Sequence, residues 1–425
     1  MEYPQWGNGS VNGQAHSGTL LPDTTGPEVH LVGGSRAEAI KLAPVVDWMH
    51  RRARMRPVLV DSGQHDSMFE QALGSFALRP DLRLRNDQGC TGQASHAEQL
   101  SGMVRLLDEH LMLRRPAAVV AQGDTTTALA TALAAFWRGI PVVHLEAGLR
   151  SHNVRAPFPE ETTRRLVAQV STLHLAPTSR AAENLRSEGL GGSGVLTVGS
   201  TAVDAAIRVS GRPVAFTDPR LEAVEWRARC GNCRLLVVTV HRQESWGAPL
   251  AGVLNALTTL LQRHPDLEVV LPIHPHPALR KQVMTGLFGT DRVHVTAPLP
   301  YDAFCRLLST ARLVLTDSGG VQEEAPIFGV PVLVLRENTE RVEAVEAGCS
   351  VLVGTEHRRL ADHVSRLLQD SADRQAMVYA GNPFGDGHAG HRVEHAIAWM
   401  LGLEQTPPCP PQSVRYTPSE RLRTE

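Results

Sequence analysis

Residues 313–341, with the sequence LVLTDSGGVQEEAPIFGVPVLVLRENTER, decide the fold of this chain. The apolar run at 313–315 predicts a strand, the turn at 317–320 ends it, and a helix and a second strand at 332–335 follow. A strand, a glycine turn and a helix together aim free backbone N–H groups at an anion. We interpret the turn as a phosphate cradle with an arginine, Arg336 or Arg341, on its far side, although an ordinary serine-capped turn explains this segment alone equally well.

The same strand–turn–helix rhythm starts near residue 28 and continues along the chain. Short apolar runs that alternate with helices are typical of parallel sheets covered on both faces. The predicted fold class is therefore α/β, with two facing, doubly wound, Rossmann-like domains. The strands expected are 29–32, 58–61, 117–121, 141–145, 173–176, 235–240, 268–273, 313–315, 332–335 and 351–353, and the helices include 36–52, 125–137, 160–170 and 392–403.

The domain organisation follows from where this rhythm lapses. Strand and helix signals weaken at 199–211, so we place one domain at 28–200 and the other at 201–389. The amphipathic segment at about 390–404 could cross back onto the first domain. Gly-, Ser-, Thr- and Pro-rich stretches at 1–27 and 405–425 read as flexible tails, and the first lacks the basic and apolar regions of a signal peptide.

Composition excludes several classes of function. A net charge of −2 gives no basic excess, so we expect no nucleic-acid partner. No apolar run is long enough to span a membrane. Six cysteines scattered over 425 residues fit reduced thiols and a cytoplasmic location. Cys230 and Cys233 lack two further soft ligands nearby, so we predict no metal site. No GxGxxG motif precedes an acidic residue, so we expect no dinucleotide cofactor.

Polar side chains follow the predicted strands, where open α/β sheets bind their ligands. Arg36 and Lys41 open the first helix, where positive charge is unfavourable unless an anion lies nearby. Lys41 is also one of only two lysines in the chain. His241 ends another apolar strand, where it is explained nearly as well as a structural histidine. Two such edges facing each other would form an active-site cleft.

Acidic residues stand at three of these positions. Asp124 precedes a predicted helix and, taken alone, is better explained as its N-cap. Glu146 leaves an apolar strand at a tight turn, where a carboxylate often has a raised pKa suited to proton transfer. Glu160 and Glu161 follow two prolines at the start of a helix. A first-turn role with an ion pair to Arg164 explains one of these two glutamates.

Long segments of the chain resemble the non-hydrolysing UDP-N-acetylglucosamine 2-epimerases. The resemblance runs from about residue 29 to 392. The segments that carry it are GGSRAEAIKLAPVV (33–46), DSGQHDSMF (61–69), AQGDTTTALATALAAF (121–136), PVVHLEAGLRS (141–151), PFPEETTRR (157–165), TVHRQES (239–245), LPIHPHP (271–277), TDSGGVQEEAPIFGVPVLVLRENTERVEAVEAG (316–348) and NPFGDGHA (382–389).

The resemblance implies a GT-B-like arrangement, a UDP-sugar substrate bound between the domains, no cofactor and a homodimer. It implies inversion at C2 of UDP-N-acetylglucosamine, by elimination of UDP to 2-acetamidoglucal and re-addition. The residues it implicates are Ser318, Gly319, Gly320, Arg341 and Arg36 at the nucleotide and its diphosphate, Glu324 at the ribose, Leu299 and Phe304 at the uracil, Lys41, Asp124, Glu146, Glu160, Arg164 and His241 around the sugar, and Gln64 and His65 at an effector site.

The chain also departs from the family pattern. Ala37 and Val342 stand where the family usually has proline, and Thr163 and His276 where it usually has asparagine. These changes leave the expected acid and base residues intact. Three alternatives remain from the sequence: a GT-B glycosyltransferase, a 2-epimerase of a related UDP-amino sugar in secondary metabolism, and a UDP-sugar sensor without chemistry.

Overall fold

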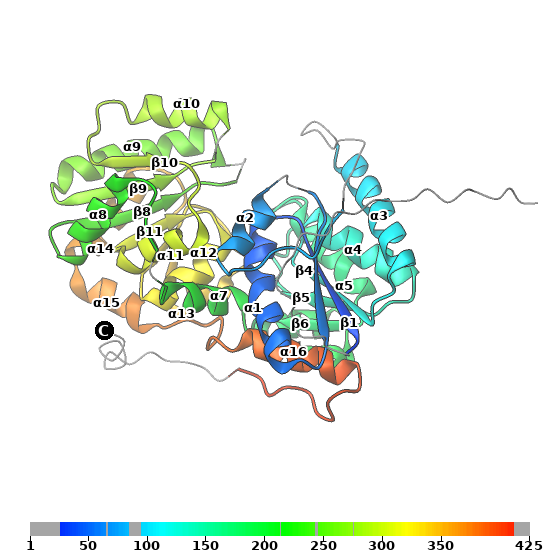
Figure 1. Cartoon of the computed structure of the whole chain (residues 1–425). Coiled ribbons are helices and arrows are strands. Elements are labelled where there is room, and N and C mark those ends of the chain that lie inside the picture. Colours follow the sequence, from blue (N-terminus) through cyan, green and yellow to red (C-terminus); the bar gives the residue numbers. More distant parts are fainter. Residues whose placement is uncertain are drawn as a thin grey trace, which may run out of the picture.

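The computed structural model describes residues 26–64, 67–84, 95–212, 214–242, 245–274 and 276–411. Within these residues the chain forms one seven-stranded and one six-stranded parallel sheet, each with helices packed on both faces (Figure 1). The predicted α/β class with two parallel, doubly wound sheets is confirmed. We name the part built on the first sheet the N-terminal unit and the part built on the second sheet the C-terminal unit.

The N-terminal unit has the strand order β3-β2-β1-β4-β5-β6-β7. Its central strands are mostly apolar and almost entirely buried, as expected for strands that are covered on two sides. The strands are β1 (Glu28–Gly33), β2 (Arg56–Asp61), β3 (Leu82–Arg83), β4 (Ala118–Gln122), β5 (Val142–Leu145), β6 (Leu173–Ala176) and β7 (Val195–Thr197), and the helices are α1 (Arg36–Arg52), α2 (Met68–Gly74), α3 (His96–Leu113), α4 (Thr126–Trp137), α5 (Glu160–Val170), α6 (Ser179–Ser187) and the 3-10 helix η1 (Gly192–Gly194).

The C-terminal unit has the order β10-β9-β8-β11-β12-β13. Its strands are β8 (Arg234–Thr239), β9 (Leu267–Pro272), β10 (Val293–Thr296), β11 (Leu313–Thr316), β12 (Val332–Val334) and β13 (Ser350–Leu352), and the helices that accompany it are α7 (Thr201–Ser210), α8 (Pro219–Arg229), α9 (Ala248–Arg263), α10 (Pro277–Gly286), α11 (Tyr301–Thr310), α12 (Gly319–Glu324), the 3-10 helix η3 (Ala325–Phe328), α13 (Val342–Ala347), α14 (His357–Gln369) and α15 (Ser371–Tyr379). The last helix of the chain, α16 (Ala389–Met400), packs against α1 of the N-terminal unit (Figure 1).

Local signals predicted ten of the strands described above and the helices α1, α4, α5, α12 and α16. Helix α1 begins and ends as expected because Ser35 and Glu38 form a reciprocal capping box and Ala53 closes the helix in the left-handed conformation. The expected lapse at 199–211 is wrong, because α7 occupies this segment. Ser200 caps α7 by accepting a hydrogen bond from the backbone of Ala202. The short strands β3, β7 and β10 lie at or next to sheet edges and were not predicted.

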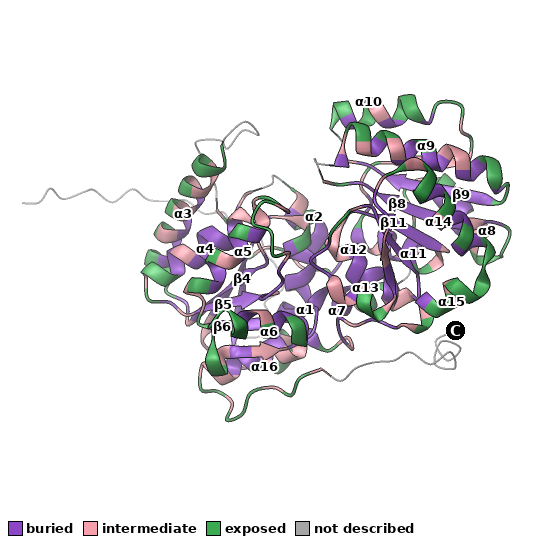
Figure 2. Cartoon of the chain, turned by 180° about the vertical axis from the view of Figure 1, so that it is seen from behind, coloured by how far each residue is buried: buried purple, intermediate pink, exposed green. Residues whose placement is uncertain are grey.

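The two units share buried surface. Helix α7 packs against α1, α11, α12 and α16. Tyr301 and Cys305 of α11 lie in the same apolar cluster as Val46 and Phe76 of the N-terminal unit. Figure 2 shows the strands of both sheets buried and the outer faces of helices such as α10 exposed. The carboxyl ends of the central strands of both sheets thereby come to lie on either side of one interface.

Candidate active site

A cavity of about 260 Å³ lies between the two units. Its wall on the N-terminal side comes from α1 and the first residue of α2, and its wall on the C-terminal side comes from the strand ends, α11 and α12 with the turn that begins it. Apolar side chains from both units line it together with a small set of charged groups, as is typical of ligand sites. Of the residues predicted from the sequence, the cavity is lined by Arg36, Lys41, His241, Leu299, Phe304, Ser318, Gly320 and Glu324.

The turn after β11 has the form of an anion cradle. Ser318 is the N-cap of α12, yet its side chain makes no capping hydrogen bond, so the simple serine-cap explanation is not supported. A Cβ atom on Gly319 would lie 2.7 Å from Cζ of Arg341, so only glycine allows the guanidinium to pack on this turn. The backbone N–H of Ser318 donates to the hydroxyl of Thr316 at 3.0 Å, which fixes the start of the turn.

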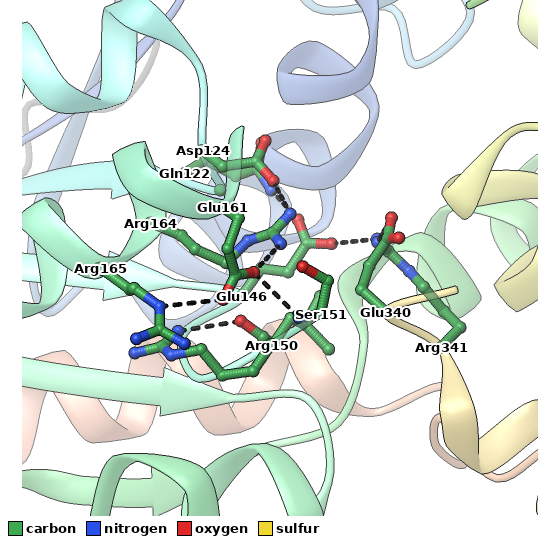
Figure 3. A network of polar contacts seen from close by, with 12 residues as sticks. Gln122, Asp124, Glu146, Arg150, Ser151, Glu161, Arg164, Arg165, Glu340 and Arg341 are labelled. Carbon is green, nitrogen blue, oxygen red and sulfur yellow. Dashed lines mark hydrogen bonds and ion pairs between the residues drawn. The ribbon is translucent and has the colours of Figure 1, made fainter. Parts of the chain in front are cut away.

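Arg341 joins the two units through a set of ion pairs (Figure 3). Its Nε donates to Glu323 at 2.8 Å and one terminal nitrogen donates to Glu340 at 2.5 Å, both within the C-terminal unit. Its other terminal nitrogen donates to Oε1 of Glu146 at 2.6 Å, across the interface. The guanidinium therefore contacts three carboxylates. Because both charged partners are desolvated here, these pairs hold their geometry far more firmly than surface pairs would.

Glu146 follows β5 in the left-handed conformation, with φ of 66°. It leaves the apolar strand β5 as expected, and its carboxylate is surrounded by polar donors. Lys41 Nζ lies 2.6 Å from Oε1 and 2.5 Å from Oε2, and the side-chain amide of Gln122 donates to Oε2. Burial lowers the pKa of Lys41, but the charges of Glu146 and Glu323 together outweigh this effect and raise it overall, so the ammonium stays charged.

Asp124 is not the helix cap that its position suggested. Thr125 caps α4 by accepting a hydrogen bond from the N–H of Ala128. The carboxylate of Asp124 instead forms an ion pair with Arg164 of α5, and Arg164 also donates to Glu161 at 2.8 Å (Figure 3). Burial raises the pKa of Asp124, but the charge and hydrogen bond of Arg164, together with the charge of Arg341, outweigh this effect, so the pKa lies below its usual value.

Glu160 is the first residue of α5, one turn before Arg164 on the same helix. The ion pair expected between Glu160 and Arg164 is replaced by the pairs of Arg164 with Asp124 and Glu161. Glu161 is fully buried and accepts a further hydrogen bond from the backbone N–H of Ser151 at 2.9 Å. Of the two glutamates, Glu161 therefore has the structural role, and Glu160 remains the candidate for chemistry.

His241 reaches the cavity because a buried aspartate holds the chain that carries it. Asp317 accepts hydrogen bonds from the backbone N–H groups of His241 and Arg242, both at 3.0 Å, and from the hydroxyl of Ser245 at 2.8 Å. This aspartate directly follows β11, and His241 lies two residues beyond the end of the neighbouring strand β8. The contact fixes the strand end while leaving the imidazole exposed to the cavity.

The cavity also holds a carboxyl group with an unusual proton affinity. Burial, followed by the negative charge of neighbouring Glu323, raises the pKa of Glu324 to about 7. Burial likewise lowers the pKa of Arg36, an effect that Glu324 opposes. Ionisation of Glu324 is therefore costly in the free protein and would become favourable on contact with hydroxyl donors of a ligand.

Three residues at this site were not predicted: Gln122, Glu323 and Glu340. Glu323 and Glu340 are adjacent in sequence to predicted residues and Gln122 lies two residues before Asp124, and this proximity was the signal available. Burial raises the pKa of Glu340, but Arg341 and then Arg336 outweigh this and bring it well below its usual value. A carboxylate so surrounded by arginines keeps their side chains in place.

The predicted effector pair is described only in part. Gln64 accepts a hydrogen bond from the hydroxyl of Thr127 at 2.6 Å, and His65 lies outside the described residues. In the described ranges of the chain, no group of three or more His, Cys, Asp or Glu side chains could hold a metal ion. Cys230 and Cys233 are free thiols. Over the same ranges, every helix is too short or too polar to cross a bilayer.

Comparison with known proteins agrees with this geometry. The family model for UDP-N-acetylglucosamine 2-epimerase matches residues 48–398. The UDP-N-acetylglucosamine 2-epimerase of Escherichia coli K12 is 38% identical over 372 residues, which covers 87% of this chain and 98% of that relative.

Solved structures give the same result. The Staphylococcus aureus MnaA–UDP co-structure superimposes with a TM-score of 0.84 at 34% identity, covering 90% of this chain and 99% of that one. The Neisseria meningitidis UDP-GlcNAc 2-epimerase bound to UDP-GlcNAc has a TM-score of 0.79 at 33% identity. The match covers 88% of this chain and 100% of that one. The facing-unit, GT-B-like arrangement expected from the resemblance matches these structures. The chain therefore belongs to the UDP-N-acetylglucosamine 2-epimerase family.

Proposed function

We propose that this protein interconverts UDP-N-acetylglucosamine and UDP-N-acetylmannosamine by inverting C2 of the hexose. One observation carries the proposal: Arg341, which packs on the anion cradle at Gly319, contacts Glu146 of the opposite unit at 2.6 Å. A diphosphate bound at the cradle would therefore leave its sugar beside the carboxylates that follow β4 and β5. The relatives described above are named for this reaction, which supports the same assignment.

The chemistry must overcome a C2–H bond that no carbonyl group acidifies. In the proposed reaction the C1–O bond breaks and its electron pair leaves with UDP. The C2 proton passes to a carboxylate, and the electron pair of the C2–H bond forms the C1=C2 double bond of 2-acetamidoglucal. Return of UDP to C1 and of a proton to the opposite face of C2 gives the epimer, so no oxidant or reductant is consumed.

The C-terminal unit would bind the nucleotide. Ser318, Gly319 and Gly320 would contact the diphosphate with Arg341, where preorganised donors stabilise the charge that develops on the leaving group. His241 faces the same cavity and would contact this charge. In this proposal Glu324 accepts hydrogen bonds from the ribose hydroxyls, and Arg36 contacts the nucleotide. Leu299 and Phe304 flank the uracil.

The N-terminal unit would exchange the proton. Asp124, Glu146 and Glu160 are the candidate carriers, and inversion needs carriers on both faces of C2 or one that reaches both. The ion pair with Arg164 favours the charged form of Asp124, and Lys41 holds the carboxylate of Glu146 in place. Arg341 already contacts two carboxylates of its own unit in addition to Glu146. A bound diphosphate would therefore compete with Glu146 for the hydrogen-bond donors of Arg341.

The test is incubation with UDP-N-acetylglucosamine in D₂O, followed by NMR of C2. Deuterium at C2 of an intact nucleotide sugar, with the N-acetylmannosamine isomer appearing, is the expected result. Saturable UDP-sugar binding without exchange would contradict the proposal. Glu146→Gln should still bind UDP yet lose most of the exchange. Glu183→Gln, at an exposed position on α6 away from the cavity, is its control and should exchange normally.

We further propose that the enzyme is a cytoplasmic homodimer. Free thiols at Cys230, Cys233, Cys305, Cys349 and Cys409 support a reducing compartment. Light scattering of the purified protein would test the dimer, since a monomeric mass at micromolar concentration would contradict it.

A further inference from the structure

Gln122 lies beside the proposed catalytic carboxylates, and the proposed reaction assigns it no role. It is the last residue of β4, and its side chain is only 2% exposed. Strands β4 and β5 pair in parallel with Gln122 opposite Leu145, so Glu146 follows directly on the neighbouring strand. The amide of Gln122 donates a hydrogen bond to Oε2 of Glu146. A buried neutral donor therefore contacts a residue proposed to exchange protons.

The donors around Glu146 are divided between its two oxygens. Oε2 accepts from Gln122 and from Lys41 at 2.5 Å. Oε1 accepts from Lys41 at 2.6 Å and from Arg341 at 2.6 Å. Each carboxylate oxygen has two lone-pair sites. Both oxygens are therefore fully occupied, but only one of them depends on a donor from the opposite unit.

A bound diphosphate would change this balance on one side only. Arg341 packs on the cradle glycine and would turn toward the phosphate, which vacates one lone pair of Oε1. Gln122 and Lys41 belong to the same unit as Glu146 and would stay, so Oε2 remains occupied. We propose that Gln122 is a positioning residue that keeps Oε2 of Glu146 filled and thereby directs the C2 proton to Oε1.

This inference rests on the proposed epimerase function and specifies which atom accepts the C2 proton, namely Oε1 of Glu146. When the C2–H bond breaks, the proton forms a bond to Oε1, and the electron pair stays with the sugar as the C1=C2 bond while UDP departs. A neutral amide suits this role. It cannot compete with Oε1 for the proton, and it adds no charge to a site that already holds Lys41 and Arg341.

A purely structural role for Gln122 makes a different prediction. If the amide only linked the ends of β4 and β5, its loss would lower stability while the protein that remained folded would turn over normally. If it directs the proton, its loss leaves Oε2 able to accept a proton that cannot return to C2. Turnover then falls in folded enzyme, and the pH dependence of kcat changes as well.

The experiment compares Gln122→Met with the unchanged enzyme. Methionine has a similar length and flexibility but no N–H donor. We expect kcat for epimerisation and for deuterium exchange at C2 to fall about tenfold, the effect of losing one hydrogen bond to a charged group. KM should change by less than about twofold because Gln122 does not line the cavity. The acidic limb of the pH–kcat profile should move to higher pH, since the deprotonated base has lost a donor.

Two further variants make the result specific. Gln122→His keeps a ring N–H donor at a similar reach and should recover most of the lost turnover. Thr131→Val removes a buried hydroxyl of the same unit that has no hydrogen-bond partner among the described residues, and it should leave kcat and the pH profile unchanged. Thermal denaturation and UDP titration verify that each variant folds and binds. If Gln122→Met does not fold, Gln122→Asn, whose amide is one methylene short, replaces it with the same expectations.

Each outcome decides something. Normal kcat and an unshifted pH profile in Gln122→Met, or Gln122→His as slow as Gln122→Met, would overturn the inference while the proposed function stands. Absence of C2 exchange in the unchanged enzyme would overturn the proposed function and this inference with it. A tenfold loss with unchanged KM, a shifted acidic limb and recovery by histidine would establish the positioning role.

Discussion

Replacing Glu324 by glutamine should stabilise the protein at alkaline pH. Glu324 lines the cavity, is 6% exposed and follows Glu323, which is also buried. Burial and then the charge of Glu323 raise its pKa from 4.5 to about 7. A carboxyl group placed in this way is adapted to a ligand, and it costs stability whenever the ligand is absent.

The magnitude follows from the difference between the folded and unfolded proton affinities. With a folded pKa of about 7 against 4.5, the folded state binds this proton more tightly than the unfolded state. The favourable contribution is complete below about pH 4.5 and is lost as the pH rises through about 7. The cost of holding Glu324 ionised at pH 8 is about 3 kcal/mol, because one pKa unit corresponds to about 1.4 kcal/mol. Glutamine fills the same space without that cost.

The assay is thermal denaturation of the unchanged protein and Glu324→Gln at pH 5 and pH 8. The variant should melt several degrees higher at pH 8, since about 1 kcal/mol shifts Tm by about 2–4 °C in domains of this size. Most of the difference should disappear at pH 5. Glu109→Gln, at an exposed position on α3, is the control and should melt like the unchanged protein at both values. Equal melting of Glu324→Gln and the unchanged protein at pH 8 would refute the reasoning.

Further predictions concern the nucleotide cradle and its support. Arg341→Ala should weaken UDP binding about tenfold to a hundredfold in calorimetric titration, because charge-assisted hydrogen bonds are lost; unchanged affinity would place the anion elsewhere. Gly319→Ala puts a Cβ 2.7 Å from Cζ of Arg341 and should weaken UDP binding too, whereas normal binding would show that the guanidinium moves freely. Asp317 accepts hydrogen bonds from three groups, and Asp317→Asn replaces one of its acceptor oxygens by an NH₂ donor. The variant should be destabilised by about 2 kcal/mol and should turn over more slowly because His241 is released. An unchanged melting temperature would contradict the last prediction. UDP affinity should also fall about tenfold from pH 8 to pH 6 as Glu324 takes up its proton, a fall that Glu324→Gln should lack.

The elements that sequence patterns predicted well carry strong local signals. Helix α5 and strand β6 have the bounds expected from apolar periodicity, and α1 is delimited by its capping residues. The misses have physical causes as well. Strand β7 has only three residues, too few for a periodic pattern. Helix α7 has only ten residues and lies between the glycines at 199 and 211, which made the segment look like a linker.

The candidate site likewise has features that the sequence predicted and features that it did not. Residues at the ends of strands could be chosen because parallel sheets gather such ends at one edge. The ion-pair partners of these residues could not be predicted from the sequence. Asp124 looked like a cap until Arg164, forty positions away, proved to be its partner. Glu146 looked like a carboxyl group in an apolar turn until Lys41 and Arg341 were found beside it.

The amino-acid sequence alone determined the α/β rhythm, the two sheets, the glycine turn at 318–320 and the family, because these depend on patterns within one or two dozen residues. Only the tertiary structure decided the ionic surroundings of the carboxylates. Lys41 and Glu146 lie 105 positions apart, and Glu146 and Arg341 lie 195 apart. Charges interact through the space between them rather than along the chain, so the proton affinities and partners of these groups are properties of the folded interface between the two units.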